Sequence, residues 1–291
     1  MSRLPVSILE YNVVAEFERV AKGNNLNIQA PVLEGKVGST INLVVDKAPP
    51  KSPHADMDSR EITLYESHLA FIWAYIYSSF VIYEECVQLP LIQETFDGSI
   101  QFTTSLTRRA KSLQDWAFLF STQYSSWDDD RLPSPRRYVS DKEQWYGEKA
   151  NAIFQTAVCF LLYHEYAHLT LGHVAASDDN SWSIEQEKDA DNFALQKVVD
   201  SGAPEKEQLR AGVALVLICA SNFFLPRGLR GIWQRAHPNL HDRLRHALSH
   251  LGLDSDKSKF YLYYLASISI HQYLSSKGTH LPLPDAESAE D

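Results

Sequence analysis

The feature that most constrains the fold is a helical pattern that covers nearly all of the chain after residue 140. Within residues 142–172 the inward-facing positions recur at spacings of three and four, which indicates one face of an amphipathic helix: Ile153, Ala157, Phe160, Leu161, His164, His168 and Leu171. Further helices are expected near residues 184–200, 204–225, 238–251 and 257–275. The chain after residue 140 is therefore predicted to fold as one helical unit.

The first 140 residues have a more mixed pattern. A β-branched run at residues 41–45 predicts a strand, and residues 61–65 are a candidate second strand. Helices are expected at residues 67–88 and 106–121. Residues 125–140 include three consecutive aspartates and two prolines, which predicts a polar loop and the internal boundary of the chain.

These patterns predict a mainly α fold of the α+β class, with a small β element near the N-terminus. Three regions are expected. Residues 1–140 form a mixed α/β region that recognises a substrate or a trigger, residues 141–280 form the helical core, and residues 281–291 form an acidic disordered tail. The tail is assigned from composition, because its last seven residues include four acids, which favours disorder.

Composition and charge narrow the class of partner. The 291 residues include 27 Lys and Arg against 37 Asp and Glu, a net charge of −10, so no nucleic acid substrate is expected, because phosphate binding needs clustered positive charge. Residues 69–83 and 211–225 are the most membrane-like segments, but both are short and are expected to be buried helices. The N-terminus lacks a signal-peptide pattern. A cytoplasmic protein with no membrane partner is predicted, with buried free thiols at Cys86, Cys159 and Cys219.

The helix of residues 142–172 contains the pattern His164-Glu165-Tyr166-Ala167-His168. Two histidines four residues apart project from one helical face, so both imidazoles can reach one metal ion. Glu165 lies beside that face, where it can hold a water bound to the metal. Burying the two imidazoles without partners would cost free energy. A bound metal would remove this cost, and histidines that are hydrogen-bonded within the core are the alternative.

Catalytic zinc needs three protein ligands and one open position, so a third ligand must come from elsewhere. The metzincin pattern does not fit, because its third histidine would fall at Val174 and its glycine at Leu171. His173 is expected to point away from the ligand face and to cap the helix or lie on the surface. A glutamate on the following helix is the other option.

Two registers compete on that following helix, Glu185 with Asp189 and Glu187 with Asp191. Helical phase decides between them, because Glu187 and Asp191 share a small, apolar face, whereas Glu185 and Asp189 lie on the polar face. Glu187 is therefore predicted as the third ligand. Asp191, one turn later, is expected to accept a hydrogen bond from the free ring nitrogen of a ligating histidine.

A further polar element follows at residues 236–243, where Pro238 fits the first turn of a helix. His237 then lies at the helix entrance and Arg243 about two turns in, so this pair could flank the metal and stabilise a developing oxyanion. Spacing alone does not choose His237 over its neighbours, because the same helix carries other polar groups: His241, Arg245, His246 and His250.

Taken in order, these motifs resemble those of the gluzincin metallopeptidases of the HtpX and CAAX-prenyl-protease type, which are membrane enzymes. A closer resemblance, over roughly residues 60–250, is to the phage-exclusion peptidase Lit family. It is carried by four blocks: Glu61-Ile62-Thr63-Leu64 leading into Phe71-Ile72-Trp73-Ala74, Tyr163-His164-Glu165 to His168, Gln186-Glu187 to Asp191, and His237-Pro238 to Arg243.

The resemblance implies a helical zincin core and a cytoplasmic zinc endopeptidase that cuts elongation factor Tu during phage infection. It implies Zn²⁺ held by His164, His168 and Glu187, with Glu165 as the general base. His237 and Arg243 would stabilise the transition state. A protease that attacks its own host must stay inactive until triggered, so a phage-derived activator is expected as a second partner.

Two other functions stay open. The same site could cleave a bacterial or phage repressor, as a regulatory metallopeptidase that acts on a protein and not on DNA. Alternatively, a closed zinc site with four protein ligands could hold helices together in a non-catalytic binding module. The intact Glu165 and the three good ligands favour catalysis over the latter.

Overall fold

The computed structural model describes residues 3–38, 41–174, 183–200, 202–225 and 240–279. In these residues the chain is mainly helical, with one sheet of three short strands. The predicted mainly α (α+β) class is therefore confirmed. The predicted acidic tail and His237 lie outside the described residues.

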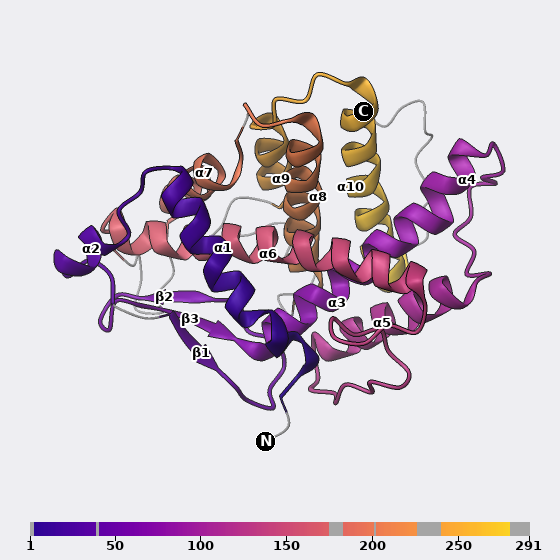
Figure 1. Ribbon diagram of the computed structural model, residues 1–291, viewed down its shortest axis with the longest axis horizontal. Coiled ribbons are helices and arrows are strands. Elements are labelled where there is room, and N and C mark those ends of the chain that lie inside the picture. The colour runs from indigo at the N-terminus through magenta and orange to yellow at the C-terminus, as the bar shows by residue number, and fades with distance from the viewer. Residues whose placement is uncertain (1–2, 39–40, 175–182, 201, 226–239, 280–291) are drawn as a thin grey trace.

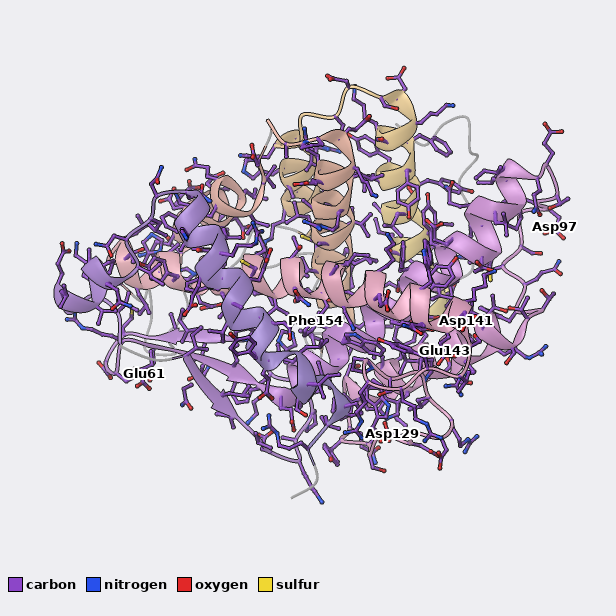
Figure 2. The ribbon with its side chains drawn as sticks, viewed as in Figure 1. Glu61, Asp97, Asp129, Asp141, Glu143 and Phe154 are labelled. Atoms are coloured by element: carbon purple, nitrogen blue, oxygen red, sulfur yellow. The ribbon has the colours of Figure 1, made fainter. Side chains whose placement is uncertain are left out.

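The longest helix, α6 (Asp141–Thr170), crosses the molecule along its long axis and carries the histidine pair (Figure 1). Ser140 caps the start of α6, because its side chain accepts a hydrogen bond from the Glu143 amide at 3.2 Å. Figure 2 shows Asp141 and Glu143 near one end of the helix, and Phe154 at the centre of the molecule. All side chains from residue 156 to residue 169 are buried, so this half of α6 is enclosed on every side and not along one stripe alone.

The sheet lies along one side of α6 (Figure 1). Its strand order is β1 (Ile41–Val44), β3 (Glu61–Tyr65) and β2 (His54–Asp56), with β1 parallel and β2 antiparallel to the central β3. The two strands expected from the sequence, β1 and β3, are both present. The sequence pattern does not indicate β2, because this strand has three residues and begins directly after Pro53 in a proline-rich segment.

The N-terminal segment packs across α6. A 3-10 turn, η1 (Pro5–Leu9), leads into α1 (Glu10–Gly23), and a short helix, α2 (Gln29–Leu33), follows. The buried face of α1 consists of Val13, Phe17, Val20 and Ala21. The Tyr163 hydroxyl of α6 donates a hydrogen bond to the Phe17 carbonyl at 2.8 Å, which joins the first helix of the chain directly to the helix of the histidine pair.

Two further helices complete the region before residue 140. α3 (Glu66–Tyr83) follows β3 without a break and is buried along its whole length. It continues through a π-helical turn, η2 (Glu84–Gln88), into α4 (Leu89–Ile92). α5 (Ser105–Phe120) begins at a capping box and packs against α3. The helices predicted at residues 67–88 and 106–121 are thereby confirmed, with small shifts at their ends.

After α6 the chain forms the four predicted helices: α7 (Ile184–Val198), α8 (Glu205–Ser221), α9 (Leu240–Ser249) and α10 (Asp256–Ser276). A 3-10 turn, η3 (Asn222–Phe224), extends α8. The stretch Glu205–Phe224 is long and apolar enough to cross a membrane, but 78% of its apolar window is buried inside the protein, as in the core helix of a soluble protein. The burial predicted for this segment is confirmed.

One continuous hydrophobic core includes residues from both sides of residue 140. Its fully buried aromatic side chains come from α3, α5 and α6, among others: Trp73, Phe120 and Phe154. The three cysteines are free and buried, as predicted. The division into functional regions at residue 140 stays a prediction.

Candidate metal centre and active site

Helices α6 and α7 bring three potential metal ligands together. His164 and His168 come from successive turns near the C-terminal end of α6, and Glu187 comes from the first turn of α7. A capping box at Ser183 starts α7 and so sets the direction of this first turn. All three ligand side chains are buried, and their ligand atoms lie within 4.8 Å of one another. The structure thus brings together the three residues that the sequence predicts as ligands.

The spacing of these atoms fits one metal ion. His164 Nε2 lies 3.3 Å from His168 Nε2 and 3.2 Å from Glu187 Oε2, and His168 Nε2 lies 3.9 Å from Glu187 Oε1. Zinc–nitrogen bonds of about 2.0–2.1 Å in a tetrahedral site place two ligand atoms about 3.3 Å apart. Two imidazole nitrogens and one carboxylate oxygen are also a donor set of catalytic zinc sites. The residues therefore fit Zn²⁺ in both geometry and chemistry.

The ion pair between Asp191 and Arg243 contacts the Nδ1 side of the His164 ring. The Asp191 carboxylate lies one turn after Glu187 on α7, with Oδ1 2.9 Å from His164 Nδ1. Arg243 of α9 donates from Nε and Nη2 to the same carboxylate at 2.7 Å and 2.6 Å. Burial raises the pKa of Asp191, but Arg243 and His164 together hold that pKa well below its usual range. Asp191 therefore stays ionised and makes the contact with His164 that the sequence predicts.

Glu165 lies beside the ligands and is held by the sheet. Its Oε2 accepts a hydrogen bond from the Ala55 backbone amide at 2.8 Å, and Ala55 is the middle residue of the edge strand β2. Burial raises the pKa of Glu165 to about 7. The charge of Glu187 raises this pKa further, whereas His164 and the hydrogen bond from the Ala55 amide lower it. A carboxylate with a pKa near neutrality is suited to accept and then return a proton. The contact with Ala55 was not predicted, because a backbone donor leaves no side-chain signature.

The two histidines differ in charge before a metal binds. Burial lowers the pKa of His164, but hydrogen bonds with Asp191 and Glu187 raise it to about 10. Burial lowers the pKa of His168 to about 3, and the neighbouring His164 lowers it as well. Among the described residues, three carboxylates and one guanidinium lie around the two rings: Glu165, Glu187, Asp191 and Arg243. When these groups are ionised, a divalent cation balances their charge.

Of the two positions predicted for His173, the surface one is wrong because the residue is buried, whereas its backbone amide does cap α6 by donating to the His168 carbonyl at 3.1 Å. Its side chain is 7% exposed, and its Nδ1 lies 2.9 Å from His168 Nδ1. The prediction fails because the chain reverses direction at Gly172, whose φ is +68°, and this reversal carries residue 173 back onto the last turns of α6. A glycine directly after the helical pattern is the sequence signal for such a reversal.

The predicted oxyanion pair is described in part. His237 lies outside the described residues. The Arg243 side chain is 12% exposed, and its two hydrogen bonds to Asp191 connect it with His164. A direct role for either residue in stabilising an oxyanion stays a prediction, whereas the structure shows that Arg243 binds the Asp191 carboxylate that contacts His164.

A buried cluster of two histidines and a glutamate, flanked by a second glutamate, is an arrangement suited to hydrolysis, and the family match agrees with this class of protein. The Peptidase U49 family model matches residues 62–266, which include all of these side chains. The match covers more than half of the chain, so the chain belongs to the Peptidase U49 family. The predicted membership in a peptidase family is thereby confirmed.

Among curated proteins, the chain is similar to the cell death peptidase of Escherichia coli (strain K12). The two sequences are 26% identical over 198 residues, which make up 64% of this chain and 62% of that protein. The chain therefore spans less than two thirds of the length of this relative. No solved structure matches the chain.

Proposed function

We propose that the protein is a zinc-dependent endopeptidase in which His164, His168 and Glu187 hold Zn²⁺. The observation that carries the proposal is the group of three buried ligand atoms beside the carboxylate of Glu165. Membership in the Peptidase U49 family supports proteolytic activity.

An enzyme fits this site better than a zinc-stabilised binding module does. Within the described residues no fourth His, Cys, Asp or Glu joins the three ligands. Three protein ligands leave the open position that a catalytic zinc ion needs, whereas a structural site is closed by four. The number of ligands among the described residues therefore favours catalysis.

The chain's own residues divide the work of peptide hydrolysis between them. When bound, zinc would supply a Lewis acid that activates a water molecule and polarises the scissile carbonyl. Glu165 accepts a proton from the attacking water on the oxygen that Ala55 does not hold, and then delivers it to the leaving amine. Asp191 keeps the ring of His164 in its ligating orientation. We assign stabilisation of the developing oxyanion to His237 or Arg243.

We further propose a role in phage exclusion, in the cytoplasm, with elongation factor Tu as the protein substrate and a phage-derived activator as the trigger. The resemblance to the Lit family and the similarity to a protein named cell death peptidase support this role. The net charge of −10 supports a protein substrate over a nucleic acid. Residues 1–140 are proposed to recognise the substrate or the trigger, and residues 1–61 of this region lie outside the family match.

The decisive test is the variant Glu165→Gln, which keeps the shape of the side chain but removes the base. We expect it to fold and to bind one zinc ion, while cleavage falls by about 10²- to 10⁴-fold or more, the usual contribution of a general base. Cleavage is measured by mass spectrometry of new N-termini in bacterial extract, with and without phage infection, and on purified elongation factor Tu.

The matched control for this test is Glu148→Gln, an exposed glutamate on the same helix, which should cleave as the parent does. If Glu165→Gln cleaves at the parent rate, the proposed mechanism is wrong. If the parent cleaves a repressor and leaves elongation factor Tu intact, the chemistry stands and the proposed substrate is wrong.

A further inference from the structure

We propose that His173 is a positioning residue that holds the imidazole of His168 in its metal-binding orientation. The inference rests on the proposed metal centre and assigns a role to a histidine outside the ligand set. Its basis is the 2.9 Å separation between His173 Nδ1 and His168 Nδ1, in two side chains that are both buried.

The backbone of the α6 terminus places His173 at this point. Gly172 adopts a left-handed conformation with φ +68°, and the His173 amide donates a hydrogen bond to the His168 carbonyl at 3.1 Å. This bond between the second residue after the helix cap and the third-last helical residue is the Schellman motif, which brings these two residues side by side. Beyond the turn, Gln186 of α7 donates from Nε2 to the Val174 carbonyl at 3.0 Å. The segment that carries His173 is thus attached to both α6 and α7.

The direction of the hydrogen bond follows from the chemistry of a ligating imidazole. His168 presents Nε2 to His164 and Glu187, so the lone pair of Nε2 would be the one given to the metal. A neutral imidazole that ligates through Nε2 carries its proton on Nδ1. His168 Nδ1 therefore donates to His173 Nδ1, and His173 carries its own proton on Nε2. The contact selects the ligating tautomer of His168 and fixes the angle of its ring.

His173 orients the ring of His168 as Asp191 orients the ring of His164, but as a neutral acceptor and not as a charged one. In the part of the chain that the structure describes, the site already contains three buried carboxylates against one guanidinium: Glu165, Glu187, Asp191 and Arg243. A fourth carboxylate at position 173 would leave negative charge that a divalent cation does not balance, and buried unbalanced charge is costly. A neutral acceptor orients His168 without adding to this charge.

Two variants of the full-length chain separate the acceptor atom from the shape of the ring. His173→Phe keeps a ring of similar size but has no acceptor, whereas His173→Asn keeps an acceptor near the position of Nδ1 but has no ring. Zinc affinity is measured by competition with a chelator, and Co²⁺ replaces zinc to report ligand geometry through its visible spectrum. We expect His173→Phe to lose about 10- to 100-fold in zinc affinity, as is usual when a partner of a ligating histidine is removed. His173→Asn should recover most of that loss.

Thermal unfolding of the metal-free proteins tests whether a loss of affinity reflects a damaged fold, and His250→Ala, a partly exposed histidine directly after α9, is the control for loss of an imidazole. The inference is overturned if His173→Phe binds zinc as tightly as the parent and gives the same Co²⁺ spectrum. It is also overturned if His173→Asn loses as much affinity as His173→Phe. If the parent itself binds no zinc, the proposed metal centre fails and this inference fails with it.

Discussion

At the scale of single residues, burial separates two glutamates that lie two positions apart on α7. The Glu187 side chain is 1% exposed and faces the two histidines, whereas the Glu185 side chain is 80% exposed and pairs with Lys188 at 3.0 Å. A surface ion pair of the latter kind contributes little to stability. The two positions therefore provide a matched pair for a test of the ligand set.

We expect Glu187→Gln to weaken zinc binding by at least about 10-fold, because an amide oxygen is a poorer ligand for zinc than a carboxylate. Glu185→Gln should bind zinc as the parent does. The measurement is the zinc content of the purified proteins after dialysis, followed by chelator competition. Equal affinity in the two variants would contradict the assignment of Glu187 as a ligand.

His68, outside the candidate site, also matters at this scale, because it is buried without a hydrogen-bond partner in the described part of the chain. His68 of α3 is 2% exposed, and neither ring nitrogen has a hydrogen-bond partner within the described part of the chain. Burial lowers the pKa of His68 to about 3. Since the unfolded chain binds this proton near pH 6.5, acid favours the unfolded state from pH 6.5 down to about pH 3.

His68→Leu should therefore make the metal-free protein less sensitive to acid. Between pH 6 and pH 4 the parent is expected to lose up to about 1.4 kcal/mol per pH unit more than the variant, which corresponds to the release of one proton per molecule on folding. Denaturant unfolding at pH 7, 6, 5 and 4 gives the two curves. Parallel curves would show that His68 is not the group that titrates.

At the scale of secondary structure, helical periodicity predicts the ligand set because it encodes which residues face a neighbouring helix. The phase of α6 indicates that His164 and His168 point inward, and the phase of α7 selects Glu187 over Glu185; the structure agrees with both. Periodicity ends where a helix ends, so it gives no information on a chain reversal. The buried position of His173 was for this reason not predicted.

The end of α6 provides a prediction of its own. Gly172 has a left-handed φ, and a Cβ added there would meet no atom within 4 Å. Gly172→Ala should therefore lower the free energy of unfolding by about 1–2 kcal/mol through backbone strain alone, and Gly172→Asn by less, since asparagine tolerates this conformation better. Denaturant unfolding of the metal-free proteins measures both values.

Gly23, at the end of α1, is the control for this effect. It also has open space around its Cα, but it does not have a positive φ. Gly23→Ala should leave stability unchanged or raise it by up to about 1 kcal/mol. If Gly172→Ala and Gly23→Ala have the same stability, backbone strain is not the reason for a glycine at position 172.

At the scale of the whole molecule, the candidate site depends on segments that are far apart in the chain. The ligands come from α6 and α7, the support for Asp191 comes from α9, and the contact to Glu165 comes from β2. Sequence motifs place Arg243 near the site, but its pairing with Asp191 depends on how α9 docks against the other helices. Such docking is a property of the folded molecule and has no local pattern in the sequence.

The shared core predicts how the molecule unfolds. Phe17 of α1 is buried and stacks on Tyr163 of α6 with ring centroids 4.4 Å apart, so Phe17→Ala should cost about 3–5 kcal/mol. The loss should shift one cooperative transition, seen at the same denaturant concentration by tryptophan fluorescence and by circular dichroism. Tyr11→Ala on the same helix, where Tyr11 is 82% exposed, should change stability by less than about 0.5 kcal/mol. A separate early transition in Phe17→Ala would instead indicate that residues 1–140 unfold as an independent unit.

The hydrogen bond from Ala55 to Glu165 also bears on how this site can evolve. Its donor is a main-chain N–H, which every residue type except proline supplies, so selection for the bond imposes almost no preference on the side chain at position 55. The donor also precedes residues 62–266, the span shared with the Peptidase U49 family. A substitution at position 55 can therefore leave the contact in place, unless the new residue is proline. A shift of β2 would change this hydrogen bond, and with it the pKa of the Glu165 carboxyl, while the sequence of residues 164–168 stays the same.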